Sequence, residues 1–202
     1  MSRAETHPTS KILKPWPALA PSGDGLVSQI IDGSKEPQPA SGSACGKAII
    51  IGEHAVVYGA RAVAIPLKSL RFGMELKPKP KRQIHFQLAG KDASDLIKGT
   101  IRDGIQALQV EDFGADIEAH STLPIGAGLG SSAALCIATL KTLSASFQAE
   151  LPKLTLAKLG NALEKRFHGN PSGLDTAVVA YETAISFTKP RGPEAIAVNP
   201  DS

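Results

Sequence analysis

The sequence predicts an α+β fold in which strands come first and helices follow. Short apolar runs closed by glycine or proline fill residues 48–66, and apolar residues recur at helical spacing from Leu96 onward. A run of strands followed by a run of helices is typical of the α+β class. With 202 residues, 42% of them hydrophobic, the chain is long enough to form a large domain around its own core.

The first strands are predicted from continuous apolar runs. Residues 48–51, 55–59 and 62–66 are such runs, each ended by glycine or proline, and we expect buried β segments there. Residues 71–77 and 82–88 are predicted as two further strands. Between them lies a segment rich in proline and basic residues, which suits a solvated hairpin tip.

The helices are predicted from a change of period. Between Leu96 and Leu108 the apolar residues lie three or four positions apart, and Asp92 or Ser94 can cap this helix. Residues 115–121 alternate as a strand does and lead into a glycine-rich run. Helices are then expected from residue 131 to about 147 and from 154 to 167.

Composition limits the partners. Residues 1–42 are rich in proline, serine and glycine and are predicted to be a weakly ordered leader. A net charge of +3 argues against a nucleic-acid partner, and no apolar stretch is long enough for a membrane span. Cys45 and Cys136 have no metal-ligand spacing, so neither a disulfide framework nor a zinc site is expected, and a reducing cytoplasm fits best.

The most informative stretch is LPIGAGLGSSAA, residues 123–134. Its glycines permit positive φ, and the first turn of the helix that follows offers unpaired N–H groups to an anion. The run is either a tight turn or a phosphate cradle. It is not a Walker loop, because no lysine follows Gly130. One of Ser131 and Ser132 can cap the helix, which leaves the other for Mg²⁺ or phosphate.

Two other polar clusters admit more than one interpretation. One joins Lys47 to Glu53 and His54, and the other joins Glu164 to Asp175. Asp175 follows a Gly/Pro turn, where a carboxylate either caps the next segment, which the residues alone favour, or acts as a base. Glu164 is either a rim charge paired with its basic neighbours or a carboxylate turned toward Mg²⁺.

Taken in order and spacing, three blocks resemble the GHMP kinase superfamily, which is named for galactokinase, homoserine, mevalonate and phosphomevalonate kinases. They are ACGKAIIIGEHAVVYG at 44–59, the glycine-rich run at 123–134, and EKRFHGNPSGLDTAV at 164–178. The third block is the most discriminating and favours the mevalonate kinases within the superfamily. One departure is Cys45, where the family usually has proline.

The resemblance covers residues 43–188 and implies the GHMP kinase N-terminal ATP-binding domain. That domain has a ribosomal protein S5 domain 2-like fold, with a mixed sheet and helices packed on one side. Family members continue into a second domain, so residues 189–202 are expected to begin a C-terminal domain that this chain lacks. Either the chain is a truncated or split version of the enzyme, or its partner half is on another polypeptide. The expected partner is a separate C-terminal half or a second copy of the chain in a homodimer.

The resemblance also implies roles for individual residues. Asp175 would take the proton of the substrate hydroxyl, and Lys47 would lower the pKa of that base or neutralise charge in the transition state. Ser132 and Glu164 would hold Mg²⁺. Glu53 and His54 would lie near the substrate with Lys47 and Asp175, although a structural role for His54 stays open. The triphosphate of ATP would lie against Pro124, Gly126, Ala127, Gly128, Leu129, Gly130, Ser131 and Ser132.

The implied function is phosphorylation of the primary hydroxyl of mevalonate by Mg-ATP, giving 5-phosphomevalonate for isoprenoid synthesis. Turnover is expected to be poor without a C-terminal half. Two alternatives remain. The chain is a catalytically silent nucleotide-binding fragment or interaction protein, or it is another GHMP kinase, acting on galactose, homoserine or phosphomevalonate.

Overall fold

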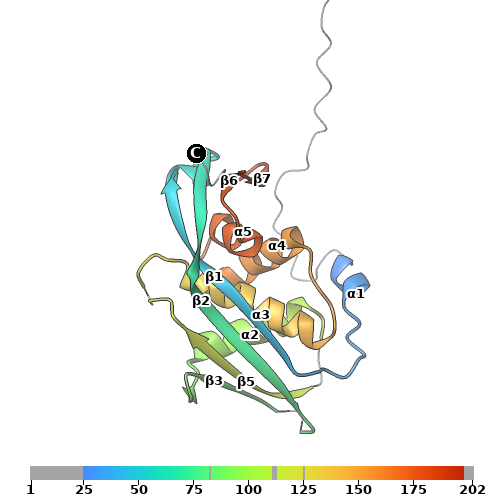
Figure 1. Ribbon diagram of the computed structural model, residues 1–202. Helices are drawn as coiled ribbons and strands as arrows, with labels where there is room; N and C mark the ends of the chain where they lie inside the picture. The colour runs from blue at the N-terminus through green and yellow to red at the C-terminus, as the bar shows by residue number, and fades with distance from the viewer. Residues whose placement is uncertain (1–24, 82, 111–112, 125, 198–202) are drawn as a thin grey trace, which may run out of the picture.

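The computed structural model describes residues 25–81, 83–110, 113–124 and 126–197 (Figure 1). The elements in chain order are α1 (Leu26–Ile30), β1 (Ala40–Ile51), the 3-10 helix η1 (Ala55–Tyr58), β2 (Ala62–Lys79), β3 (Ile84–Leu88), β4 (Lys91–Asp92), α2 (Asp95–Ala107), β5 (Gly114–Ser121), α3 (Ser131–Ser146), α4 (Lys153–Glu164), α5 (Leu174–Tyr181), β6 (Ile185–Thr188) and β7 (Gly192–Ala195).

The 18-residue strand β2 organises the sheet. β1 pairs with β2 along most of its length, while β5 and β6 pair with the two ends of β2. The sheet order is β4-β3-β5-β2-β6-β7, with β1 added to β2. Every pairing is antiparallel except β3 with β5, which is parallel. The sheet is therefore mixed, and the predicted α+β class is confirmed.

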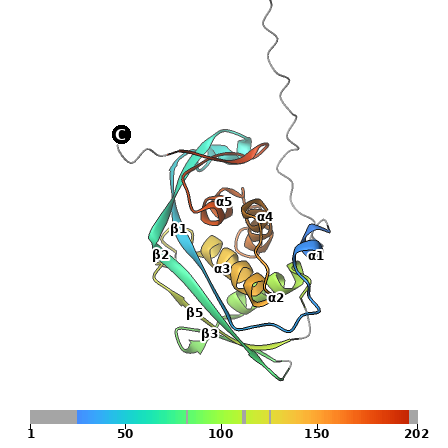
Figure 2. The same ribbon diagram turned by 45° about the vertical axis from the view of Figure 1, so that its right-hand side comes forward.

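Helices α2, α3, α4 and α5 lie on one side of this sheet, as Figure 2 shows. α3 is apolar around most of its surface, which suits a helix buried between the sheet and the other helices. Its residues Ile137 and Leu140 share the core with Met74 and Ile117 of the sheet. Close packing of β1 on α3 requires a glycine, because a Cβ at Gly42 would lie 2.5 Å from Thr142 Oγ1.

The prediction of a buried strand at residues 55–59 was wrong. Residues Ala55–Tyr58 form a 3-10 helix that ends at Gly59, whose φ of 88° lies in the left-handed region. Tyr58 is 90% exposed, and Ile50 and Ile51 before the turn are also exposed. A short apolar run does not by itself reveal which side chains face the core, and in this one only Val56 is buried.

The predicted hairpin around residues 78–80 was also wrong. β2 continues without a break to Lys79, and β3 does not pair with it. Instead β5, which comes later in the chain, lies between them and pairs with both. An ion pair of 2.7 Å between Lys79 and Asp116 joins β2 to β5. Strands adjacent in sequence were separated here because a later strand inserts between them.

The described structure begins before residue 43. α1 buries Val27 and Ile31 in the core, and β1 starts at Ala40, so residues 25–42 are not a weakly ordered leader. Residues 1–24 of the predicted leader lie outside the described residues. At the other end, β7, which lies in the stretch expected to begin a C-terminal domain, pairs with β6. Within the described ranges, no helix has both the length and the apolar character that a membrane span requires.

Candidate active site

A buried lysine and a helix-borne aspartate form the centre of the site. Lys47 lies on β1 and is 4% exposed, and its Nζ is 2.9 Å from Oδ2 of Asp175. Asp175 is the second residue of α5, a helix that the sequence interpretation did not predict. The helix cap is Gly173, and Asp175 makes no side-chain capping bond. Of the two interpretations of Asp175, the structure therefore excludes the simple cap.

Glu164 faces inward at the end of α4. Its side chain is 1% exposed, and its Oε1 accepts a hydrogen bond of 3.1 Å from Ser132 Oγ at the start of α3. The neighbouring Arg166 makes two hydrogen bonds to Asp103 of α2 instead. Glu164 is therefore not a rim charge paired with its neighbours.

The environment of Glu164 disfavours its negative charge. Burial and, to a smaller extent, the nearby charge of Asp175 raise the pKa of Glu164 from its ordinary value to about 7, against the opposing effects of Ser132 and Lys47. A bound cation would reverse this preference. Glu164 and Ser132 supply carboxylate and hydroxyl oxygens, the donors that Mg²⁺ prefers.

The protein ligands available are few, which suits Mg²⁺ delivered with a nucleotide. In the described part of the chain, no group of three or more His, Cys, Asp or Glu side chains could hold a metal ion. Mg²⁺ usually binds proteins through one or two side chains and takes its other ligands from phosphate and water. The residues present therefore fit the expected ion.

The glycine-rich run adopts the backbone that its composition predicts. Gly126, Gly128 and Gly130 have φ of 77°, 72° and 78°, all in the left-handed region that favours glycine. Gly130 is the cap of α3, and no side chain caps that helix, so neither Ser131 nor Ser132 is the simple cap considered above. The first N–H groups of α3 and the Ser131 hydroxyl remain available to an anion, whereas the Ser132 hydroxyl donates to Glu164.

The glycine-rich run and the charged pair contact each other. The backbone N–H of Lys47 donates to the carbonyl of Leu129 at 2.9 Å. A Cβ at Gly130 would lie 2.6 Å from Lys47 Cγ, so the lysine side chain passes directly against this glycine. Pro124 and Ala127 are exposed on the same run, and residue 125 between them lies outside the described part.

A pocket of about 170 Å³ opens beside these groups and is lined by Ile49, Glu53, Glu164, His168, Pro171, Ser172, Gly173, Leu174 and Asp175. Of the two residues expected near the substrate, Glu53 lines this pocket. His54 does not, and it is exposed just before η1. The structure thus brings together Lys47, Glu53, Ser132, Glu164 and Asp175 and leaves His54 outside.

Sequence reasoning gave no role to His168. Its side chain lines the pocket, and its Nε2 lies 3.5 Å from Ser132 Oγ. The available signal was its position in the block that ends at Asp175. A histidine beside a glycine-rich turn nevertheless gives no indication of what it faces.

Comparison with known proteins agrees with this geometry. Residues 95–183 match the model of the GHMP kinases N terminal domain. The mevalonate kinase of Archaeoglobus fulgidus is 33% identical over 156 residues, which are 74% of this chain and 53% of that protein. The chain spans about half the length of the curated relatives it matches.

Solved structures give the same picture. The crystal structure of Methanococcus jannaschii mevalonate kinase superposes with a TM-score of 0.69 at 28% identity, covering 82% of this chain and 57% of that one. Lactococcus lactis galactokinase shares the fold at a TM-score of 0.68 and 20% identity, covering 82% of this chain and 48% of that one. From these matches, the chain contains a GHMP kinase N-terminal domain and is similar to mevalonate kinases in sequence and in fold.

Proposed function

We propose that this chain is the phosphate-binding half of a mevalonate kinase, which transfers the γ-phosphoryl group of Mg-ATP to the primary hydroxyl of mevalonate and releases 5-phosphomevalonate and ADP. The observation that carries the proposal is the Lys47–Asp175 pair, held against the glycine-rich run and beside Glu164. Phosphoryl transfer needs positioned groups and relief of negative charge more than covalent catalysis, and this arrangement supplies both.

Asp175 would act on the acceptor hydroxyl. Its carboxylate accepts the hydroxyl proton as the oxygen forms its bond to the γ-phosphorus, and the bond from that phosphorus to the bridging oxygen of ADP breaks. The Lys47 ammonium, 2.9 Å from Asp175, holds the carboxylate in place and offsets negative charge on the phosphoryl group. Because Asp175 is 27% exposed while Lys47 is buried, the base has the more open access to a substrate.

The nucleotide would lie over the start of α3. The left-handed backbone at Gly126, Gly128 and Gly130 leaves room and N–H groups for the phosphates. Ser132 and Glu164 would hold Mg²⁺, which when bound neutralises phosphate charge and orients the γ-phosphate. Its charge would also remove the penalty that burial places on the ionised form of Glu164.

The acceptor would occupy the pocket beside Asp175. Glu53 and His168 line it and are the polar residues that we propose contact the substrate, while His54 would contribute only after a rearrangement of the turn before η1. Mevalonate is the preferred acceptor because the curated relatives at 33% identity are named mevalonate kinases. The fold alone does not discriminate, since galactokinase shares it.

The half-length match favours one alternative function. A chain that spans about half of its relatives could bind Mg-ATP without completing the reaction, as a silent nucleotide-binding fragment. We propose that turnover needs a C-terminal half, continuous with this chain or supplied separately, or a second copy of the chain. The buried free thiols of Cys45 and Cys136 suit a reducing compartment, and we propose the cytoplasm.

A coupled ADP-release assay tests the proposal. The purified chain is assayed with mevalonate, galactose, homoserine and phosphomevalonate, alone and with the separately expressed C-terminal half of a mevalonate kinase. Turnover with mevalonate that disappears in Asp175→Asn supports the proposal. Turnover with another acceptor overturns the substrate assignment. Mg-ATP binding without turnover in any combination supports the silent fragment.

A further inference from the structure

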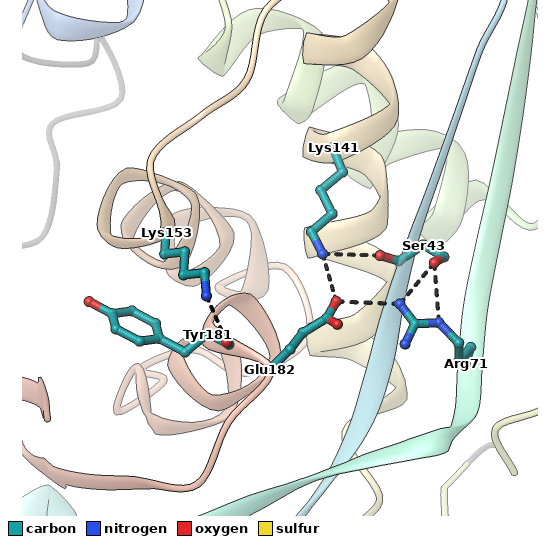
Figure 3. Close-up of polar contacts among 6 residues, drawn as sticks. All are labelled: Ser43, Arg71, Lys141, Lys153, Tyr181 and Glu182. Atoms are coloured by element: carbon teal, nitrogen blue, oxygen red, sulfur yellow. Dashed lines mark hydrogen bonds and ion pairs between the residues drawn. The ribbon is translucent and has the colours of Figure 1, made fainter. Parts of the chain in front are cut away.

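A second charged cluster lies at the far end of the elements that carry the active site. Glu182, directly after α5, accepts hydrogen bonds through its Oε1 from Lys141 Nζ at 2.7 Å and from Arg71 at 3.3 Å (Figure 3). Arg71 of β2 also donates to Ser43 Oγ at 2.9 Å, and Lys141 of α3 donates to the Ser43 carbonyl at 3.2 Å. We call Ser43, Arg71, Lys141 and Glu182 the Glu182 cluster.

The backbone of Glu182 is unusual for its residue type. Its φ of 51° and ψ of 31° lie in the left-handed region, where glycine is the favoured residue. Burial acts to raise the pKa of Glu182, but Lys141 and Arg71 lower it below its ordinary value, so the side chain stays charged. The three charged side chains are each about a third exposed, and ion pairs this open contribute little to stability. The small stabilisation from these ion pairs is therefore largely offset by the backbone strain at Glu182.

The cluster instead joins the elements that hold the active site. β1, α3 and α5 each carry one cluster residue and one active-site residue, which are Ser43 and Lys47, Lys141 and Ser132, and Glu182 and Asp175. α5 has only eight residues, so Asp175 and Glu182 are roughly 10 Å apart along its axis. Because the helix is this short, a shift of its end at Glu182 would also move Asp175.

The end of α5 borders a pocket of about 580 Å³, lined in part by Lys141, Tyr181 and Glu182. On the pocket side, side chains of β1, α3 and α4 lie across this space from the end of α5, while Val179 and Ala180 on its other side are buried. The side-chain hydrogen bonds of Glu182 and one of 3.3 Å from Lys153 to the Tyr181 carbonyl join this end of α5 to its neighbours (Figure 3), in addition to the backbone bond from Glu182 to the Val178 carbonyl.

We infer that Glu182 is a positioning residue, which fixes α5 against α3 and β1 so that Asp175 stays in contact with Lys47. The expected effect of Glu182 on kcat rests on the proposed function. Its expected effect on the contact between Lys47 and Asp175 rests on the geometry alone. Glu182 touches no group of the active site and acts only through α5.

Glu182→Gly separates positioning from stability. Glycine relieves the left-handed strain but removes the hydrogen bonds, so we expect an unchanged or higher free energy of unfolding. In the active assembly we expect kcat to fall about tenfold with an unchanged KM for ATP, because small misplacements of a catalytic group are costly in rate. Glu150→Gln is the matched control, since Glu150 lines the same pocket and makes no ion pair within the described residues.

Acylation of Lys47 gives a readout that does not require turnover. In the intact chain Lys47 is buried and paired, so acetic anhydride should label it slowly relative to exposed Lys91. In Glu182→Gly we expect the labelling ratio of Lys47 to Lys91 to rise several-fold, toward that of Asp175→Asn. Lys141→Arg should keep the low ratio and Lys141→Met should raise it.

The outcomes are distinct. An unchanged labelling ratio in Glu182→Gly overturns the positioning role, whatever the kinetics. An equal rise in Lys141→Arg and Lys141→Met also overturns it, because the ion pair would not be the cause. If the unsubstituted assembly shows no turnover, the proposed kinase function fails, while the labelling result still decides the inference about Glu182.

Discussion

The side chain of Lys47 is held from two directions, by the Asp175 carboxylate 2.9 Å from its ammonium and by Gly130, against which its aliphatic part lies. These contacts join β1, the start of α3 and the start of α5. The position of Asp175 and the packing of the glycine-rich run therefore depend on the same side chain.

Asp175→Asn tests the role of the base. The amide keeps the shape of the side chain but cannot accept the hydroxyl proton, so we expect turnover with mevalonate to fall about 10²- to 10⁴-fold. Loss of the carboxylate also leaves the Lys47 ammonium unpaired, and we expect the free energy of unfolding to drop by about 1–3 kcal/mol. Steady-state kinetics and denaturant titration measure the two effects. A variant with normal kcat would remove Asp175 from the base role.

Much of the site was predictable because its residue types are unusual in their local context. Gly126, Gly128 and Gly130 ahead of a helical pattern predicted the left-handed backbone, and their φ values agree, while the anion site at these residues stays a prediction. Lys47, Glu164 and Asp175 were identified by their blocks. That these three side chains lie close together could not be predicted from hydrophobic periodicity or secondary-structure propensity, because it depends on how β1, α4 and α5 pack.

The predictions that failed concern tertiary context. α5 follows a turn rich in glycine and proline and has only eight residues, too few for a distinct helical pattern. The parallel pairing of β3 with β5 depends on a strand that comes almost thirty residues later. The open interpretations of Glu164 and Asp175 were decided only by burial and contacts, since a carboxylate near a helix end has the same sequence signature in either role.

Glu164→Gln should change the pH dependence of stability. In the unfolded chain Glu164 loses its proton near its ordinary pKa of 4.5, whereas in the folded chain it keeps it until about pH 7. Between these values the folded state binds more protons, so this residue makes the free energy of unfolding fall as pH rises from 4.5 to 7. Glutamine removes that fall, and we expect the variant to be more stable at pH 8 by about 1–3 kcal/mol.

Denaturant titrations of both proteins from pH 4 to 8 measure this difference. The variant should also lose the stabilisation that Mg-ATP gives the unsubstituted chain, because a neutral amide is a poor Mg²⁺ ligand. If the free energy of unfolding depended on pH in the same way in both proteins, the raised pKa of Glu164 in the folded chain would be contradicted.

Gly130→Ala and Gly128→Ala separate backbone strain from steric overlap. Both glycines have a positive φ, and alanine at either position should cost roughly 1–2 kcal/mol in free energy of unfolding. At Gly128 the added methyl meets no atom within 4 Å, but at Gly130 it would lie 2.6 Å from Lys47 Cγ. We therefore expect only Gly130→Ala to displace Lys47 and to increase its acylation. Equal labelling in the two variants would contradict the contact between Gly130 and Lys47.

The exposed apolar residues beside the site predict where a second half packs. Ile50 and Ile51 at the end of β1 and Val57 and Tyr58 on η1 are between 46% and 90% exposed, and they lie on either side of Glu53 in the chain. An aliphatic side chain buried in an interface contributes roughly 1.5 kcal/mol or more, so Ile51→Ser should weaken binding of a mevalonate kinase C-terminal half about tenfold. Leu154→Ser, which alters a leucine on α4 that is 44% exposed, serves as the control. Sedimentation of the labelled chain against increasing amounts of the C-terminal half measures both affinities, and equal affinities would place the interface on another face.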